Sequence, residues 1–316
     1  MKSFIMLGSL LILVACGAEG GGGGVVTHLN MATGGVAGTY YPLGGAMATV
    51  IGDRTDLNIT VMASGASADN IQQLGIGDAH IAIAQNDVMS YAFHGTGIWE
   101  GNDPVTNLAT IMSLYPETVH IVVRADSSFY SVADLYGMRV STGAIGSGVE
   151  ANAMQVLAAY GITINDITPS HLGFQDSADA MQDNVIDAFF VTSATPNTAV
   201  DTLSFAVDLR ILELSESVIN HLLNTYGFYV RDVVTSEQYT WLTAPVNTVA
   251  VQATLVATTD LDEQIVYDIL QALFEGQAEI GHARAQEFTL ESAVQSISVD
   301  LHPGAVRFFT ERGVLD

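Results

Sequence analysis

Two glycine-rich loops, each between an expected strand and an expected helix, are the residues of this chain best suited to binding a polar group. The first loop is Thr33-Gly34-Gly35-Val36-Ala37-Gly38, between a strand at 25–32 and a helix opened by Pro42. The second is Gly143-Ala144-Ile145-Gly146, between a strand at 138–142 and a helix capped by Ser147. Each arrangement places free backbone N–H groups and the positive end of a helix beside small hydroxyl side chains. Two such loops in two halves of the chain predict a polar or anionic ligand held between two domains.

The spacing of the glycines excludes a dinucleotide as that ligand. The Gly-x-Gly-x-x-Gly fingerprint would need a glycine where Thr33 stands. The run Gly143-Ala144-Ile145-Gly146-Ser147-Gly148 has the wrong spacing too. Recognition of a small ligand by backbone groups and hydroxyls remains, and we expect no cofactor.

A search for catalytic groups predicts that the protein is not an enzyme. No serine lies in Gly-x-Ser-x-Gly, because Ile145 stands two residues before Ser147 and Asp69 two residues after Ser67. The one lysine, Lys2, falls in the expected signal peptide, which excludes Schiff-base chemistry, a Ser-Lys dyad and a P-loop. The histidines show no metal-ligand spacing, so we expect no metal. They are His28, His80, His94, His120, His171, His221, His282 and His302.

Further candidates follow from the rule that open α/β sheets bind ligands beyond the carboxyl ends of their strands, at helix N-termini. Capping of the following helix explains each of them equally well. Asp87 could pair with a ligand amine, and the tyrosines could stack on a ligand or fill the core. The rule selects Ser64, Ser67, Gln85, Asp87, Ser113-Leu114-Tyr115, Gln175, Asp176, Thr192, Ser193 and Thr195.

Strand-like and helix-like segments alternate along the chain, which predicts an α/β fold with mostly parallel sheets flanked by helices. The clearest helix is 147–160, because Ser147 and Glu150 form a capping box and Gly161 stands at its end. Pro196 after Thr195 marks another helix start. We expect strands near 25–32, 57–62, 79–84, 118–124, 138–142, 164–168, 186–191 and 247–257. We expect helices near 42–52, 68–75, 86–93, 147–160, 175–183, 196–203, 215–225 and 260–280.

Two apolar segments are longer than one lobe requires, namely 118–124 and 247–257. Each could cross between two lobes as a hinge strand, or each could be an ordinary central strand, and periodicity alone does not separate these interpretations.

The composition indicates a globular, strongly acidic protein. The chain has 316 residues, 49% of them hydrophobic, which is enough for two compact domains. The formal net charge of −25 makes nucleic acids and anionic membrane surfaces poor partners and indicates a solvated surface suited to a salty medium. The same charge repels a small anion, so local N–H groups would have to hold it. We expect a monomer.

The first 24 residues are not expected to belong to the fold. An apolar run from Phe4 to Val14 is too short to span a bilayer. The run Leu13-Val14-Ala15-Cys16 resembles a bacterial lipoprotein signal, in which 1–15 is removed and Cys16, the only cysteine, is lipidated. The alternative is an ordinary signal peptide with a cysteine near its end. Residues 16–24 then form a glycine-rich tether, and the protein is exported to the periplasm or cell envelope, in contact with the membrane only through its lipid.

Ordered motifs along most of the chain resemble the TAXI family, the TRAP-associated extracytoplasmic solute-binding proteins. The resemblance covers nearly all of 25–312. Its N-terminal motifs are Thr33-Gly34-Gly35, Tyr40-Tyr41-Pro42-Leu43-Gly44-Gly45-Ala46, Ser64-Gly65-Ala66-Ser67-Ala68-Asp69-Asn70, Gln85-Asn86-Asp87 and Ser113-Leu114-Tyr115-Pro116-Glu117. The later ones are Val123-Arg124-Ala125-Asp126-Ser127, 131–140, Gly146-Ser147-Gly148, Asp187-Ala188-Phe189-Phe190 and Leu301-His302-Pro303-Gly304-Ala305.

The resemblance implies a type II periplasmic-binding-protein fold in which two lobes joined by two hinge strands close on a small molecule. It implies a receptor that delivers glutamate, glutamine or a related 2-oxo or dicarboxylic acid to TRAP membrane permease subunits driven by an ion gradient. Lobe 1 would comprise 25–122 and 252–316, and lobe 2 would comprise 123–251.

The same resemblance implies the residues that bind the ligand. One wall would be Thr33, Gly34, Gly35 and Tyr40, with Ser67, Gln85, Asp87 and Tyr115 deeper, and Ser141, Gly146, Ser147, Thr192 and Ser193 from the other lobe. No arginine is expected in the cleft, because Arg139 stands at a strand start, so helix N-termini and hydroxyls would hold a carboxylate.

Two other functions stay open on the sequence. A lipid-tethered sensory or surface antigen protein could bind the same ligand without feeding a permease. An enzyme could use the same two-lobe fold, although the motif search found no catalytic set.

Overall fold

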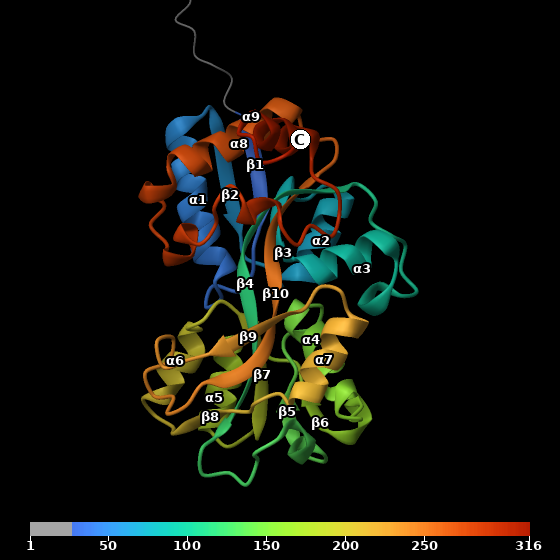
Figure 1. Ribbon diagram of the computed structural model, residues 1–316, viewed down its shortest axis with the longest axis vertical. Coiled ribbons are helices and arrows are strands. Elements are labelled where there is room, and N and C mark those ends of the chain that lie inside the picture. Colours follow the sequence, from blue (N-terminus) through green and yellow to red (C-terminus); the bar gives the residue numbers. More distant parts are fainter. Residues whose placement is uncertain (1–26) are drawn as a thin grey trace, which may run out of the picture.

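The computed structural model describes residues 27–316, which form two lobes joined by two long strands (Figure 1). The expectations for the signal peptide, Cys16 and the tether concern residues outside this range. The strands that run from one lobe into the other are β4 (Leu108–Arg124) and β10 (Val246–Thr258). They pair with each other antiparallel along most of their length. Their shared path makes one continuous ten-stranded sheet of the two lobes.

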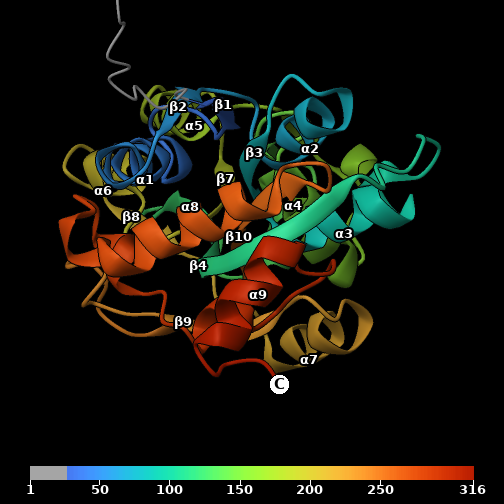
Figure 2. The same ribbon diagram turned by 90° about the horizontal axis from the view of Figure 1, so that it is seen from above.

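One lobe is built on the parallel strands β1 (Thr27–Ala32), β2 (Leu57–Met62) and β3 (Ile81–Gln85), in the order β2-β1-β3-β10-β4. Strand β3 meets the C-terminal half of β10 antiparallel. Helices cover this lobe, and α8 and α9 lie side by side at its far end (Figures 1 and 2). They are α1 (Tyr40–Arg54), α2 (Ser67–Ile76), α3 (Asn86–His94), α8 (Glu263–Glu275) and α9 (Pro303–Glu311), with 3-10 turns at Gly97–Trp99, Gln277–Glu279, Ala283–Gln286 and Ser292–Val294.

The other lobe continues the sheet from β4 through β7 (Ala188–Ser193) and β5 (Arg139–Ser141) to β6 (Thr168–Ser170). Strand β5 is parallel to both of its neighbours, and β4 pairs with β7 antiparallel. Strand β8 (Leu209–Ile211) pairs with β4, and β9 (Val230–Val234) with β10. The helices of this lobe are α4 (Gly148–Ala159), α5 (Phe174–Gln182), α6 (Thr198–Ser204) and α7 (Glu216–Thr225), with 3-10 turns at Val132–Leu135 and Ile164–Asp166.

Each lobe has its own apolar core, as the alternating pattern predicts. In the first lobe the buried rings of Phe288, Phe308 and Phe309 pack around Phe274 of α8, with ring centroids 5.5 to 6.0 Å from the Phe274 ring. In the second lobe β4, β5 and β7 contribute buried apolar side chains that pack against α4 and α7. Two separate cores allow the lobes to move as units about the strands that join them.

Several expected elements are wrong in type or extent. Residues 164–168 are not one strand but a 3-10 turn followed by β6, and the expected strand at 118–124 is only the second half of β4. Pro116 and Glu117 interrupt the apolar pattern in the middle of β4, and β-bulges against β10 lie just before them, between Thr110 and Tyr115. The strands β8 and β9 and the helix α9 were not expected. Strand β8 has three residues and β9 is largely exposed, so neither strand gives a clear apolar pattern.

Several expected helix ends are also corrected. Helix α1 begins at Tyr40, with Pro42 inside its first turn, where no N–H donor is needed. Asn197, rather than Pro196, caps α6, because its side chain accepts from the N–H groups of Ala199 and Val200. The helix expected at 260–280 is capped by Asp262 and ends before Gly276.

Candidate ligand-binding cleft

The first glycine-rich loop connects β1 to α1 and faces the other lobe. Thr33, at its start, is fully buried, and its hydroxyl donates to the Met62 carbonyl at 2.6 Å. Asn70 also donates to the Thr33 carbonyl. Thr33 therefore holds the loop in place against β2 and α2, and Gly34 and Gly35 carry the loop to the cavity wall.

The second glycine-rich loop connects β5 to α4. Gly143 and Gly146 have φ angles of +97° and +73°, a backbone region that glycine enters without strain. The expected capping at the start of α4 is present in part: the Ser147 hydroxyl accepts from the Glu150 N–H, while the Glu150 carboxylate accepts from Gly146 N–H at 2.9 Å. The Gly146 carbonyl accepts from the N–H of Ala68, at the start of α2 in the other lobe. The second loop thus brings the lobes into direct contact.

A partly open cavity of about 50 Å³ lies between the lobes, more than the 10–15 Å³ or so that a single water molecule needs. Both lobes contribute to its wall. Its lining residues are Gly34, Gly35, Gly38, Thr39, Tyr40, Ala66, Ser67, Gln85 and Glu117 on one side, and Gly148, Val149, Phe174, Thr192 and Ser193 on the other.

Seven of the residues expected to bind a ligand line this cavity: Gly34, Gly35, Tyr40, Ser67, Gln85, Thr192 and Ser193. Within the described part of the chain, the Gln85 Oε1 and Thr192 Oγ1 atoms are buried and have no hydrogen-bond partner. Because unpaired buried polar atoms are costly, these two atoms point to a ligand that would pair with them.

The other six expected residues lie elsewhere. Thr33 and Ser141 are bound within their own lobes, Ser141 through the Ser177 hydroxyl at 2.8 Å. Tyr115 is buried in the core of the first lobe. Gly146 and Ser147 line two separate surface grooves beside the cavity. Sequence position alone could not separate these residues from those that line the cavity. Whether a loop residue faces the cavity, a groove or the core depends on how the neighbouring lobe packs.

Asp87 also lies outside the cavity and takes part in a contact between the lobes. Its Oδ2 accepts from Asn152 Nδ2 of α4 at 2.9 Å, and its Oδ1 accepts from the Val88 N–H. Asn152 Nδ2 also donates to the Tyr229 hydroxyl at 3.0 Å. Burial raises the pKa of Asp87 to about 6, against the lowering effect of these hydrogen bonds. The sequence suggested a ligand amine as the partner of Asp87, whereas the structure gives Asn152.

Glu117, at the middle of β4, is the residue that sequence reasoning missed. Its carboxyl group lines the cavity, is 2% exposed and accepts a hydrogen bond from the Tyr40 hydroxyl at 2.6 Å. The pKa of Glu117 is raised to about 8: burial is the largest cause and the Asp87 charge adds to it, while hydrogen bonds from the Tyr40 and Gln85 side chains act in the opposite direction. An acidic residue inside a long apolar stretch is a signal that could have identified it.

Replacing Tyr40 by phenylalanine is expected to raise the Glu117 pKa further, because the variant loses a donor that favours the charged carboxylate. A hydrogen bond to a charged group contributes about 1.5–3 kcal/mol, so the rise should be about 1–2 pKa units. Carbon NMR of the glutamate carboxyl groups, with Glu117→Gln to assign the signal, measures it. The matched control is Tyr267→Phe, which removes an exposed tyrosine–glutamate hydrogen bond to Glu311 far from the cavity. Equal Glu117 pKa values in Tyr40→Phe and the parent protein would contradict the assigned contact.

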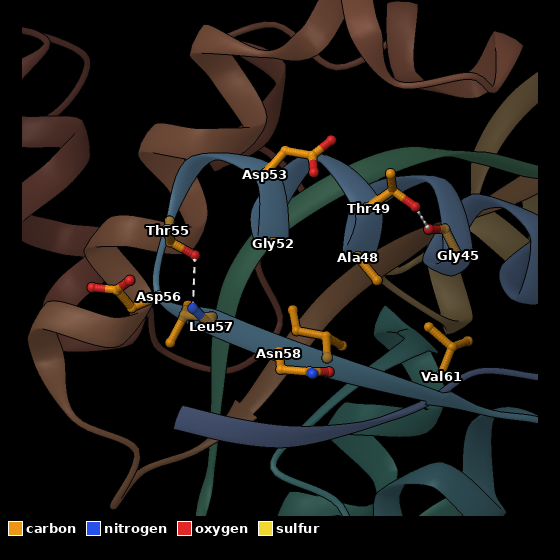
Figure 3. Close-up of a pocket in the computed structure, with 11 residues that line it drawn as sticks. Gly45, Ala48, Thr49, Gly52, Asp53, Thr55, Asp56, Leu57, Asn58 and Val61 are labelled. Atoms are coloured by element: carbon orange, nitrogen blue, oxygen red, sulfur yellow. Dashed lines mark hydrogen bonds between the residues drawn. The ribbon is translucent and has the colours of Figure 1, made fainter. Parts of the chain in front are cut away.

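A second hollow lies between α1 and β2 (Figure 3). Unlike the cavity between the lobes, it has no buried, unpaired polar side-chain atom among its described lining residues. Thr49 donates to the Gly45 carbonyl, and the Thr55 hydroxyl accepts from the Leu57 N–H, so these polar groups are already paired within the segment. The carboxylates of Asp53 and Asp56 point away from the hollow (Figure 3). We therefore place the ligand site between the lobes.

Over 27–316, no three or more side chains of histidine, cysteine, aspartate or glutamate gather as a metal site would require. In the same range no helix has the length and apolar character needed to cross a membrane.

Comparison with known proteins agrees with the two-lobe fold. The model of the NMT1-like family matches residues 31–313. Among solved structures, the periplasmic binding protein BugD is similar with a TM-score of 0.56 and 14% identity over 91% of this chain and 94% of that one. The alkanesulfonate-binding protein SsuA from Xanthomonas axonopodis pv. citri, bound to MOPS, has a TM-score of 0.54 and 17% identity over 90% and 83%. An ancestral arginine-binding protein bound to arginine has a TM-score of 0.52 and 14% identity over 84% and 98%. These similarities establish the fold of periplasmic binding proteins and leave the ligand open.

Proposed function

Because this chain belongs to the NMT1-like family and has the two-lobe fold of periplasmic binding proteins, we propose that it is an extracytoplasmic solute-binding receptor of a transporter. Its ligand is a small organic acid or amino acid, of the class of glutamate, glutamine and 2-oxo or dicarboxylic acids. The observation that carries this proposal is the cavity between the lobes, which has walls from both lobes and an unpaired buried polar atom from each.

Closure of the lobes around the ligand is the proposed mechanism. The ligand would contact Gly34, Tyr40 and Gln85 on one lobe and Thr192 on the other, and so stabilise the closed state relative to the open one. The polar contact of Asp87 with Asn152 adds to the closed state from beside the cavity. The long strands β4 and β10 connect the lobes and are the proposed hinge.

Backbone N–H groups are the proposed donors to the carboxylate of the acid. Among the described residues, no lysine, arginine or histidine lines the cavity. The N–H groups of Gly148 and Val149, in the first turn of α4, have no acceptor within 27–316. They lie at the positive end of that helix, which favours an anion.

A thermal-shift screen tests ligand binding, because a molecule that binds only the folded state raises its apparent stability. The probes are glutamate, glutamine, 2-oxoglutarate, glutarate and succinate. We expect a rise in the melting temperature with at least one of them, recovery of that compound unchanged, and a more compact particle by X-ray scattering. No shift with any probe would overturn the proposed ligand class.

We also propose that the transporter is of the TRAP type with TAXI-type receptors, on the motifs quoted above, and that the chain is exported and anchored through lipidated Cys16. Uptake of the bound solute by proteoliposomes containing the permease should then follow an ion gradient and should not need ATP. Mass spectrometry of the exported protein should find a lipid on Cys16, and Cys16→Ser should abolish it. Uptake driven by ATP, or an unmodified Cys16, would contradict the respective proposal.

A further inference from the structure

Three buried oxygen acceptors belong to residues that line the cavity between the lobes. They are the Glu117 carboxyl group of β4, the Gln85 Oε1 atom at the end of β3 and the Thr192 Oγ1 atom of β7. All three side chains are deeply buried, since the residues are 2%, 2% and 3% exposed. Gln85 and Thr192 have no partner for these atoms within 27–316. The acceptors come from both lobes, so a group that contacts them all requires the closed arrangement.

Among the described residues, the cavity can supply negative charge but no positive charge. Glu117 is the one acidic residue among the lining residues, and within the described range no basic residue lines the cavity. The titratable groups around Glu117 are Tyr40, which donates to it, Tyr115 in the adjoining core, and Asp87, whose negative charge acts on it from α3. A ligand cation would favour the ionised form of Glu117 and pair with it, whereas a ligand carboxylate would be repelled by that form at low dielectric.

A primary ammonium group fits these acceptors. It has three N–H donors and no acceptor, and its charge-assisted hydrogen bonds to a carboxylate are stronger than neutral ones. An oxo group or a second carboxylate in its place has no N–H donor to offer the Gln85 Oε1 atom or an ionised Glu117 carboxylate. Within the proposed ligand class, the amine therefore distinguishes the amino acids from the 2-oxo and dicarboxylic acids.

Resting on the proposed function, we infer that Glu117 is the amine-recognising residue of the cleft and that the ligand is an α-amino acid rather than a 2-oxo or dicarboxylic acid. Glu117, Gln85 and Thr192 receive the ammonium group. The N–H groups of Gly148 and Val149 at the start of α4 receive the α-carboxylate. Tyr40 holds the Glu117 carboxylate toward the cavity through its hydroxyl.

Calorimetry with matched ligand pairs tests this inference on the unmodified protein. The probes are L-glutamate against glutarate and 2-oxoglutarate, and L-glutamine against its des-amino counterpart. We expect the amino acid of at least one pair to bind about 30-fold or more tightly than its partner without the amine, because a charge-assisted hydrogen bond is worth about 1.5–3 kcal/mol. Equal or tighter binding of the partner without the amine in both pairs would overturn the inference while leaving the proposed solute-binding function intact. No binding by any probe would overturn the proposed function itself.

Glu117→Gln supplies the residue-level test, because it keeps the shape and the Tyr40 contact and removes the charge. We expect it to lose about 30-fold or more in affinity for the amino acid and less than about 3-fold for the partner without the amine. The matched control is Glu237→Gln, an exposed glutamate in the other lobe that should change neither affinity. Equal losses for both ligands in Glu117→Gln would contradict amine recognition.

Proton release on binding gives a measurement that does not depend on any variant. An ammonium group that binds the Glu117 carboxylate displaces the proton that this buried group holds when the cavity is empty. We expect calorimetry of the parent protein at about pH 7, in buffers of different ionisation enthalpy, to find a proton released per amino acid bound. Uptake of a proton, or no exchange, would contradict a salt bridge between the ligand amine and Glu117.

Discussion

Gly148→Ala is expected to weaken ligand binding by about 100-fold while leaving both lobes folded. Gly148 is the first residue of α4 and lies directly against Gln85 of the other lobe. A Cβ atom at position 148 would lie 2.8 Å from Gln85 Nε2 and closer still to Oε1 and Cδ, inside van der Waals contact. These atoms are the end of the Gln85 side chain, which is 2% exposed and would have to leave its place in the cavity wall. Overpacking of this kind costs about 1–3 kcal/mol, and tenfold in affinity corresponds to about 1.4 kcal/mol.

The effect should fall on closure rather than on folding, since alanine is the better helix former and the clash exists only when the lobes meet. The free energy of unfolding without ligand should therefore stay the same or rise. Calorimetry measures the affinity, and X-ray scattering should find the variant more open than the parent at equal ligand concentration. The control is Gly45→Ala in α1, where a Cβ meets no atom of the described chain within 4 Å. Parent-like affinity in Gly148→Ala would mean that binding does not need the lobe contact described here.

The free energy of unfolding is expected to fall as the pH rises from about 6.5 to 8, because of Glu117. The folded state holds the proton of this group up to a pKa of about 8, against the ordinary value of 4.5. A raised acid pKa contributes stability that is fully present below pH 4.5 and is lost as the pH rises through 8. The slope is about 1.4 kcal/mol per pH unit, and the whole contribution is on the order of 5 kcal/mol.

The window from about pH 6.5 to 8 covers the upper part of the Glu117 titration. Asp87, with a pKa raised to about 6, loses most of its contribution below this window. His120 acts in the opposite direction, because burial lowers its pKa from 6.5 to about 4, and burial lowers the pKa of His302 as well. These effects are common to the parent protein and Glu117→Gln, so the difference between their slopes reports on Glu117.

Urea unfolding of the ligand-free protein at several pH values in this window measures the slope. Glu117→Gln should remove most of it, because glutamine does not titrate, and Glu237→Gln should retain it. If the slopes of the parent protein and Glu117→Gln coincide, the Glu117 carboxyl is ionised in the folded state and its burial does not control this pH dependence.

Much of the architecture could be predicted from local pattern. Alternating strands and helices predicted the α/β fold, and the hinge interpretation of 118–124 and 247–257 identified parts of the two strands that join the lobes. Ser147 was correctly predicted as the cap of α4, because a cap depends on residues three positions apart. The short strands β8 and β9 were missed because they have too few alternating residues to give a period.

Position along a strand was enough to nominate Gln85 and Thr192, since both stand at or near the carboxyl end of a strand that reaches the cleft. The same rule nominated Asp87 and Tyr115, which the fold uses for a lobe contact and for the core. The rule identifies an edge of the sheet, and neither it nor any local pattern specifies which side chains at that edge face the cavity.

By itself the sequence determined the α/β alternation, the two glycine-rich loops, the strong negative charge and the shortage of cations at those loops, because each is a property of composition or of residues a few positions apart. Only the tertiary structure decided that Glu117 faces the cavity and that Asp87 is paired across the lobes. Tyr40 and Glu117 are 77 positions apart, and Asp87 and Asn152 are 65 apart. The first contact depends on how one lobe packs and the second on how the two lobes meet, and no periodicity within one strand or helix records either.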